Sequence, residues 1–523
     1  MENKYGLFVN KGGLFVNKGG LFVNKGGLFV NKGGLFVNKG GLLEKKMGYC
    51  FFFKNMSYIC RQKKRIMQTI YQTAEPFDQL LKNQKLDAGQ MYRPMNYVVE
   101  QPVEEGLLLY HTMTKAMLLL TPEEAETYKK NPAALTQLIE QWFLVPQSFD
   151  DRLLSRQMRG VARMLKKKSE VITEYTIMTT TDCNARCFYC YEMGRPRTPM
   201  SEETARRTAD HIINHCKGEK VTLHWFGGEP LYNLPVISLI CRRLKKAGVD
   251  YKSNMISNGY LFDDSVISEA QDLWLLKKVQ ITLDGTEQTY NRCKAYIYKG
   301  VNAYRRVIGN IHKLQDAGIK VNIRLNIDMH NAENLSELAE ELHREFSDPK
   351  GISVYLHALF EEERGSKALR DDEKRKSVFN QIADIEARLK DYGFIRPSRL
   401  SRQVKINRCM ADNDHSVVIV PNGRIGKCEH YSEDHFVGHI DSEDRDAQMV
   451  EKFKETRDEI EACATCFNYP DCVWLKLCED SPNCYQEERD HTLHQLRQSM
   501  LRDFEIFKNK EDKEDDQEDE AQD

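Results

Sequence analysis

Strand-like and helix-like patterns of hydrophobic residues alternate through the middle of the chain, between residues 172 and 360. Short runs of β-branched and aromatic residues predict strands, and longer segments with apolar residues at helical spacing separate them. The predicted strands are 174–179, 221–226, 253–257, 278–283, 321–327 and 353–360. Ser201–Cys216 and Ala303–Ala317 are typical of the helices between them. Six strand–helix units predict an α/β domain with a parallel sheet.

A mixed pattern precedes this domain, in residues 91–168. Leu107–Tyr110 and Ala116–Leu120 predict a hairpin. Thr121-Pro122-Glu123-Glu124 combines an N-cap, a proline at the first helical position and a glutamate at the third, which predicts the start of a helix. Asn131-Pro132 predicts the start of another helix. This small α+β module resembles the leader-peptide recognition domains of peptide-modifying enzymes, and a purely structural extension is the alternative.

The two ends of the chain have biased compositions. Gly-Leu-Phe-Val-Asn-Lys-Gly repeats with period seven from Gly6 to about Gly40, and two glycines in each repeat oppose a helix. We expect residues 1–66 to be disordered or to precede the native start, with a low-complexity adhesive segment as the alternative. The candidate initiators are Met47, Met56, Met67 and Met91. Residues 363–408 are expected to form a helical bridge, and residues 487–523 a helix with an acidic, solvated tail.

Composition narrows the class of protein. A chain of 523 residues can form several domains, and a net charge of −2 argues against a dedicated nucleic-acid binder. The 15 cysteines suggest a disulfide-rich secreted protein, but most of them fall in two tight groups, which favours an intracellular metal protein. No apolar stretch approaches the ~20 residues of a membrane span.

The first cysteine group directly follows the first predicted strand, in Cys183-Asn184-Ala185-Arg186-Cys187-Phe188-Tyr189-Cys190. Four thiolates complete a [4Fe–4S] cube, whereas three leave one iron open to another ligand. The loops at the carboxyl ends of parallel barrel strands carry the chemistry. The group therefore predicts a cluster with an open iron, although cysteines at such spacing also occur in zinc sites and in ordinary cores.

This C-x3-C-x2-C spacing, with an aromatic residue at Tyr189, resembles the signature of the radical S-adenosylmethionine (radical SAM) enzymes. The resemblance implies a partial (β/α)6 barrel over residues 170–362, open on one side for a large substrate. It implies that Cys183, Cys187 and Cys190 hold a [4Fe–4S] cluster. The open iron of that cluster would chelate the amine and carboxylate of SAM, and SAM would be cleaved to a 5′-deoxyadenosyl radical.

Further motifs follow successive predicted strands. Gly227-Gly228-Glu229-Pro230 matches the GGEP motif of the family, which implies that the glycines admit the methionine end of SAM and that Glu229 holds its ammonium. Without the resemblance, this run would be read as a turn. The resemblance also assigns SAM-contacting positions to Ser257, Asn258, Thr282, Asp284, Arg292 and Arg324. A guanidinium suits the SAM carboxylate, and ordinary surface positions are the alternative for the two arginines.

The second cysteine group lies in residues 409–486 and resembles the SPASM domain, which holds two auxiliary [4Fe–4S] clusters. The family pattern assigns one cluster to Cys463, Cys466, Cys472 and Cys484, and the other to Cys409, Cys428 and Cys478. The spacing departs from the family pattern at Cys478. We expect one iron of the second cluster to be open, with Asp412 or His415 as alternative ligands. Zinc is the competing metal because C-x2-C pairs also bind it.

The resemblance as a whole predicts a maturase that oxidatively modifies a ribosomally made peptide, with a thioether crosslink as one product. It implies a flavodoxin- or ferredoxin-type electron donor and, because exposed clusters are oxygen-sensitive, the cytoplasm of an anaerobe. An anaerobic sulfatase-maturating enzyme, which makes formylglycine, is the alternative. In that group an aspartate acts as base at the position of Glu429, which we take as the candidate catalytic carboxylate. A non-catalytic iron–sulfur protein is the third hypothesis.

Overall fold

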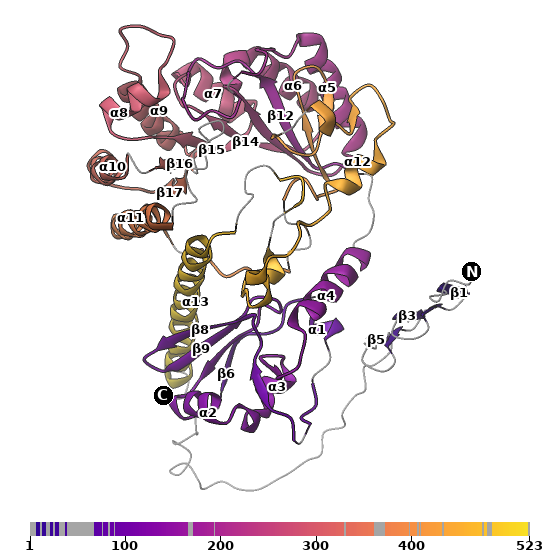
Figure 1. Cartoon of the computed structure of the whole chain (residues 1–523). Helices are drawn as coiled ribbons and strands as arrows, with labels where there is room; N and C mark the ends of the chain where they lie inside the picture. Colours follow the sequence, from indigo (N-terminus) through magenta and orange to yellow (C-terminus); the bar gives the residue numbers. More distant parts are fainter. Residues whose placement is uncertain are drawn as a thin grey trace.

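The computed structural model describes two parts of the chain (Figure 1). The first part comprises five short antiparallel strands in the repeat: β1 (Leu7–Asn10), β2 (Gly13–Val16), β3 (Leu21–Asn24), β4 (Gly27–Val30) and β5 (Val37–Asn38). The second part is residues 67–520 without 76, 82–83, 88, 166–170, 193, 329–330, 360–371, 397, 405–406, 408, 431–432, 473–474 and 479–483. Cys50 and Cys60 lie outside the described residues.

The largest sheet of the described residues has nine strands. Six of its strands run parallel in chain order: β12 (Glu174–Thr180), β13 (Val221–Gly227), β14 (Tyr251–Ser257), β15 (Leu276–Thr282), β16 (Lys320–Ile327) and β17 (Ile352–Ala358). The connecting helices are α5 (Glu202–His215), α6 (Leu234–Lys246), α7 (Asp264–Asp272), α8 (Glu287–Lys294), α9 (Ala303–Asp316) and α10 (Ala332–Glu345). The predicted partial (β/α)6 barrel is confirmed.

Alternation along β14 shows how one face of the sheet is covered. In β14, Tyr251 and Met255 are buried in the main hydrophobic core, whereas Lys252 and Ile256 are exposed. Period-two alternation places these two pairs on opposite faces of the sheet. At β14, one face of the sheet therefore packs into the core, and the other carries the exposed side chains of Lys252 and Ile256.

The sheet continues into the cysteine-rich region. β18 (Ser416–Ile419) pairs in parallel with β12, and β19 (Arg424–Gly426) and β20 (Gly438–His439) extend it in antiparallel fashion. η4 (Glu433–His435) lies between β19 and β20, and α12 (Ala447–Lys452), η5 (Glu461–Ala464) and η6 (Tyr469–Asp471) follow β20. Because β18 lies beside β12, the second cysteine region begins next to the strand that leads into the first.

The N-terminal module has a four-stranded antiparallel sheet of order β6-β10-β9-β8. Its elements are β6 (Gln68–Tyr71), α1 (Phe77–Leu80), β7 (Tyr92–Pro94), β8 (Val98–Val103), β9 (Gly106–His111), β10 (Met117–Leu120), α2 (Pro122–Lys130), η1 (Pro132–Ala134), α3 (Thr136–Glu140), β11 (Leu144–Pro146) and α4 (Asp151–Leu165). The predicted hairpin and the capping box at Thr121 and Glu124 are present. The module starts earlier than residue 91, because β6 pairs with β10.

Two long helices, α11 (Asp372–Asp391) and α13 (Gln486–Glu520), lie between the barrel sheet and the N-terminal module, because α11 contacts β17 and α13, and α13 contacts β8. The two helices are joined by a buried ion pair in which Arg375 Nε lies 3.0 Å from Glu487 Oε2. α13 runs along the sheet of the N-terminal module, where Met500 and Phe504 are buried (Figure 1). Among the described helices, none combines the length and apolar character that crossing a bilayer requires.

Candidate functional site

Cys183, Cys187 and Cys190 lie in the loop that follows β12, and all three are free and partly buried. The loop is held by short-range bonds: Cys183 N donates to Asp182 Oδ1 at 2.8 Å, and Cys190 N donates to Cys187 O at 3.2 Å. Burial raises the pKa of Cys183 to about 12 and also raises the pKa of Cys190. These thiols therefore need a cation to become thiolates, and iron is a cation of that kind.

The two glycines after β13 allow the backbone to approach the base of the cysteine loop. A Cβ on Gly227 would lie 2.1 Å from Thr180 O, and a Cβ on Gly228 would lie 2.4 Å from Asp182 O. Gly227 also has φ +122°, which side chains rarely adopt. The sequence motif suggested an approach to SAM, and the structure adds a packing role toward the residues that precede Cys183.

Replacement of Gly227 by alanine tests this packing role. We expect the free energy of unfolding to fall by more than about 2 kcal/mol, because strained backbone and a clash with Thr180 O act together. Iron binding should be lost as well. Gly318→Ala is the matched control, since Gly318 has φ +70° but nothing within 4 Å of an added Cβ. Urea unfolding and iron analysis distinguish the two, and equal behaviour of the variants would contradict the packing role.

Glu229 connects the ends of two neighbouring strands. Its carboxylate is fully buried and accepts from Leu231 N at 3.1 Å, Ser257 Oγ at 2.9 Å and Asn258 N at 2.8 Å. Burial raises the pKa of Glu229 to about 7, although these donors oppose the shift. Pro230 begins η2 (Pro230–Asn233) and accepts from Thr179 Oγ1 at 3.0 Å. The motif therefore joins β12, β13 and β14 at the mouth of the barrel.

Asn258 contacts the cysteine loop directly. Its Nδ2 donates to Asn184 Oδ1 at 2.6 Å and lies 3.8 Å from Cys183 Sγ. On the other side, Ile297 N donates to Asn184 O at 3.0 Å. The loop is thus fixed between the end of β14 and the segment that follows α8.

A buried polar network lies behind Tyr189. The Tyr189 hydroxyl donates to Asp284 Oδ2 at 2.6 Å, and Lys294 Nζ lies 2.8 Å from Tyr189 Oη and 3.0 Å from Asp284 Oδ2. Burial opposes the charge on Lys294, but the facing Asp284 carboxylate and Tyr189 hold its pKa well above the usual value. The network continues through Asn326, whose Nδ2 donates to Asp284 Oδ1 at 3.0 Å and whose Oδ1 accepts from Arg324 Nε at 2.8 Å.

Lys294 was not predicted from the sequence, whereas Arg292 was. Arg292 is exposed on α8, and the structure does not bring it to the network. Lys294 is buried at the end of the same helix, and its carbonyl accepts from Arg186 N at 2.8 Å. Two residues along a helix turn a side chain to a different face, so the choice between these cations depends on how α8 packs. Thr282, the other predicted residue here, lies opposite Arg324 in the sheet register.

Cys409, Cys428 and Cys478 are the candidate ligands of a second centre, and Cys428 follows β19 closely in the chain. Burial raises the pKa of Cys409 and of Cys428, and the nearby Glu429 carboxylate raises both further. Cys478 adds to both shifts and Cys409 adds to that of Cys428, so the three thiols lie in one neighbourhood. Asp412 Oδ1 accepts from Cys409 N at 3.0 Å. His415 Nδ1 is 2.8 Å from Val171 O, so this ring nitrogen is engaged with the segment leading into β12.

The second centre touches the cysteine loop. The rings of Tyr191 and His430 stack with centroids 4.1 Å apart. The pKa of Tyr191 is raised mainly by burial and then by the nearby carboxylates of Glu192 and Glu429. Glu429 lies between Cys428 and His430 in the chain. Its Oε2 is buried and has no hydrogen-bond partner among the described residues. The carboxylate therefore lies near Tyr191, Cys409 and Cys428, and its buried oxygen can accept a proton or a hydrogen bond.

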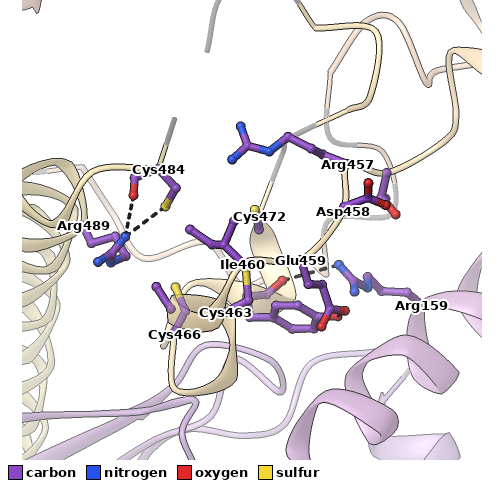
Figure 2. Close-up of a pocket in the computed structure, with 13 residues that line it drawn as sticks. Arg159, Arg457, Asp458, Glu459, Ile460, Cys463, Cys466, Cys472, Cys484 and Arg489 are labelled. Carbon is purple, nitrogen blue, oxygen red and sulfur yellow. Dashed lines mark hydrogen bonds between the residues drawn. The ribbon is translucent and has the colours of Figure 1, made fainter. Parts of the chain in front are cut away.

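Four of the last five cysteines line one pocket of ≈ 620 Å³, counting the solvent at its mouth (Figure 2). They are Cys463, Cys466, Cys472 and Cys484. Arg159, Arg457 and Arg489 also line it, and Arg489 Nη1 donates to Cys484 O at 2.7 Å and to its Sγ at 3.3 Å. Four thiolates carry negative charge onto a cluster, so this donor set and its surrounding cations fit a [4Fe–4S] group.

Single-ion binding has a different geometric requirement. Within the part of the chain that the structure describes, no three His, Cys, Asp or Glu side chains converge closely enough to hold one metal ion. A cube cluster needs wider spacing, because each thiolate binds a different iron.

Residues 177–344, which span β12 to α10, match the family described as the Radical SAM superfamily. These residues form a radical SAM domain. The family implies SAM and a [4Fe–4S] cluster, and the three thiols after β12 are a donor set that fits that cluster. The radical SAM domain holds all of the strand-end residues described above, from Cys183 to Arg324.

Known proteins resemble the chain over part of its length. Fe-coproporphyrin III synthase of Methanosarcina barkeri is 25% identical over 223 residues, covering 41% of this chain and 52% of the synthase. A probable GTP 3′,8-cyclase of Pyrococcus horikoshii is 33% identical over 147 residues, covering 27% of this chain and 43% of the cyclase. The chain thus spans about half the length of these relatives. The solved structure of native anSMEcpe with bound AdoMet and Cp18Cys peptide gives a TM-score of 0.48 at 15% identity, covering 65% of this chain and 99% of that one.

Proposed function

We propose that this protein is a radical SAM maturase that cleaves SAM and oxidatively modifies a ribosomally made peptide. The observation that carries the proposal is the direct contact between two cysteine-bearing loops, in which Tyr191 beside Cys190 stacks on His430 beyond Cys428. The bound cluster and SAM supply a 5′-deoxyadenosyl radical, which removes hydrogen from a substrate carbon. A second redox centre whose loop touches the loop of the first suits an oxidation, because the electron left on the substrate carbon needs an acceptor.

The chain's own residues position these groups. Cys183, Cys187 and Cys190 hold the first cluster, and the buried set of Tyr189, Asp284 and Lys294 fixes the loop that carries them. The barrel mouth offers SAM a row of polar groups at the strand ends. These are Glu229, Ser257, Asn258, Thr282 and Arg324, with the Gly227-Gly228 backbone and Pro230 beside them.

Two auxiliary [4Fe–4S] clusters complete the proposal. Cys409, Cys428 and Cys478 hold the nearer one, which keeps one iron without a cysteine ligand, and the four-cysteine pocket holds the other. A flavodoxin- or ferredoxin-type protein supplies the electron that starts each turnover. Because such clusters react with oxygen, the protein is expected to work in the cytoplasm of an anaerobe.

Glu429 is the proposed base, since one of its carboxylate oxygens is buried and has no hydrogen-bond partner among the described residues. Glu429→Gln should lower peptide product formation by about 10²- to 10⁴-fold, the usual contribution of a general base, while 5′-deoxyadenosine continues to form. Glu443→Gln is the control, because the Glu443 side chain is 87% exposed. Mass spectrometry of peptide and nucleoside products measures both. Parallel loss of the two products would contradict a role as base.

The substrate class is tested by the product. A thioether crosslink in a cysteine-bearing peptide leaves the peptide two hydrogens lighter, whereas formylglycine carries an aldehyde that a hydrazide traps. The carboxylate of Glu429, in the position where sulfatase-maturating enzymes use aspartate, keeps the formylglycine reaction as the second candidate. Anaerobic incubation with SAM, a reductant and either a peptide encoded beside the gene or a sulfatase peptide decides between them. Formation of neither product, nor of 5′-deoxyadenosine, would refute the proposal.

A further inference from the structure

The N-terminal module contacts the segment that bears Cys463, Cys466, Cys472 and Cys484, here called the four-cysteine segment. Two of its hydrogen bonds reach this segment on the two sides of Cys466. Asn96 Nδ2 donates to Ala464 O at 3.0 Å, between Cys463 and Cys466. Thr112 Oγ1 donates to Phe467 O at 2.6 Å, directly after Cys466. These bonds go to backbone carbonyls, so they fix the path of the cysteine-bearing chain rather than a single side chain.

Aromatic and charged contacts repeat this pattern around η6. Tyr97 stacks on Tyr469 with ring centroids 6.2 Å apart and an interplanar angle of 5°, and the Arg159 guanidinium lies 4.9 Å from the centre of the same ring. Arg152 and Arg156 from α4 pair with Glu459 at 2.9 and 3.0 Å. The turn before β8, the turn between β9 and β10, and α4 therefore converge on the segment that forms the pocket.

Lys115 is the buried charged group among these contacts. Its side chain is 2% exposed, and its ammonium donates to Thr112 O and forms an ion pair with Asp471. Asp471 ends η6 and directly precedes Cys472. Lys115 also has φ +64°, which is strained for a residue with a side chain. A buried, strained lysine is retained only where its charge is matched, and here the match comes from the four-cysteine segment.

We propose that the N-terminal module is a clamp on the four-cysteine pocket and that Lys115 is the positioning residue of this clamp. The inference rests on the proposed function, because it takes the pocket to hold an auxiliary cluster. Lys115 sets the position of Asp471 and hence of Cys472, while Thr112 and Asn96 set the path around Cys466. Without the ammonium, Asp471 loses its partner and the thiol of Cys472 is no longer held in register with Cys463 and Cys466.

The test compares cluster content in Lys115→Met, Asp471→Asn and Lys130→Met. Lys130 is the control because its side chain is 77% exposed on α2 of the same module. Iron, sulfide and the EPR signal of the reduced protein are measured, with Cys472→Ala marking the contribution of the four-cysteine pocket. Lys115→Met and Asp471→Asn should lose about one cluster per chain, or retain it with an altered EPR signal, whereas Lys130→Met should match the wild type.

Lys115→Met removes a buried charge and can fail to fold. Asp471→Asn breaks the same ion pair from the other side, at a residue that lies outside the module and is 19% exposed. Full cluster content with an unchanged EPR signal in Asp471→Asn, and in Lys115→Met that retains its circular dichroism spectrum, would overturn the clamp alone. If Cys472→Ala keeps the iron and sulfide content and the EPR signal of the wild type, the pocket holds no cluster. That result would overturn the proposed auxiliary cluster, and the clamp with it.

Discussion

Cys183→Ala is expected to reduce 5′-deoxyadenosine formation to the level seen without protein. The loop after β12 offers three thiols, and removal of one leaves too few to hold a cluster with an open iron. Iron content should fall by about one cluster per chain, and the remaining clusters should persist. Cys216→Ala is the matched control, because Cys216 is a free thiol buried in the barrel core away from the loop. Anaerobic reconstitution followed by chromatography of the nucleoside products measures the effect. Retained SAM cleavage in Cys183→Ala would remove this loop from the chemistry.

Lys294→Met is expected to produce the second large effect. Lys294 and Asp284 form a buried pair with side chains 5% and 2% exposed. Removal of one partner from such a pair leaves an uncompensated buried charge and costs about 3–5 kcal/mol. The free energy of unfolding should fall by that amount, and SAM cleavage should fall with it because Tyr189 loses its anchor.

Lys299→Met provides the control for Lys294→Met, since Lys299 is exposed in the loop that follows α8. Lys294→Arg keeps the charge and should recover part of the stability. Denaturant unfolding monitored by fluorescence, together with the 5′-deoxyadenosine assay, checks both variants. If Lys294→Met unfolds like Lys299→Met, the buried network does not support the cysteine loop.

Local patterns were sufficient to predict the barrel. Each strand from β12 to β17 is a short run of β-branched or aromatic residues followed by a helical segment, and each of these signals lies within a few residues. The capping box at Thr121 and Glu124 is local in the same way. Spacing along the chain also indicated which cysteines lie together in one loop, because thiols carried by one loop must be close in sequence.

Features that depend on long-range packing could not be predicted. The pairing of β18 with β12 joins residues more than two hundred positions apart, and no local pattern marks it. Arg292 and Lys294 are equally plausible from the sequence, and only the packing of α8 places Lys294 against Asp284. The contact of Lys115 with Asp471 joins two separate regions of the chain, so the sequence indicated a module but not what it holds.

The most direct test of the account is EPR spectroscopy of anaerobically purified, dithionite-reduced protein with and without SAM. The account predicts iron and sulfide in the protein and a cluster signal that changes when SAM is added, because SAM binds the open iron. Cys183→Ala should abolish that change. Protein that contains zinc without iron or sulfide, or a cluster signal that SAM leaves unchanged, would contradict the central claim.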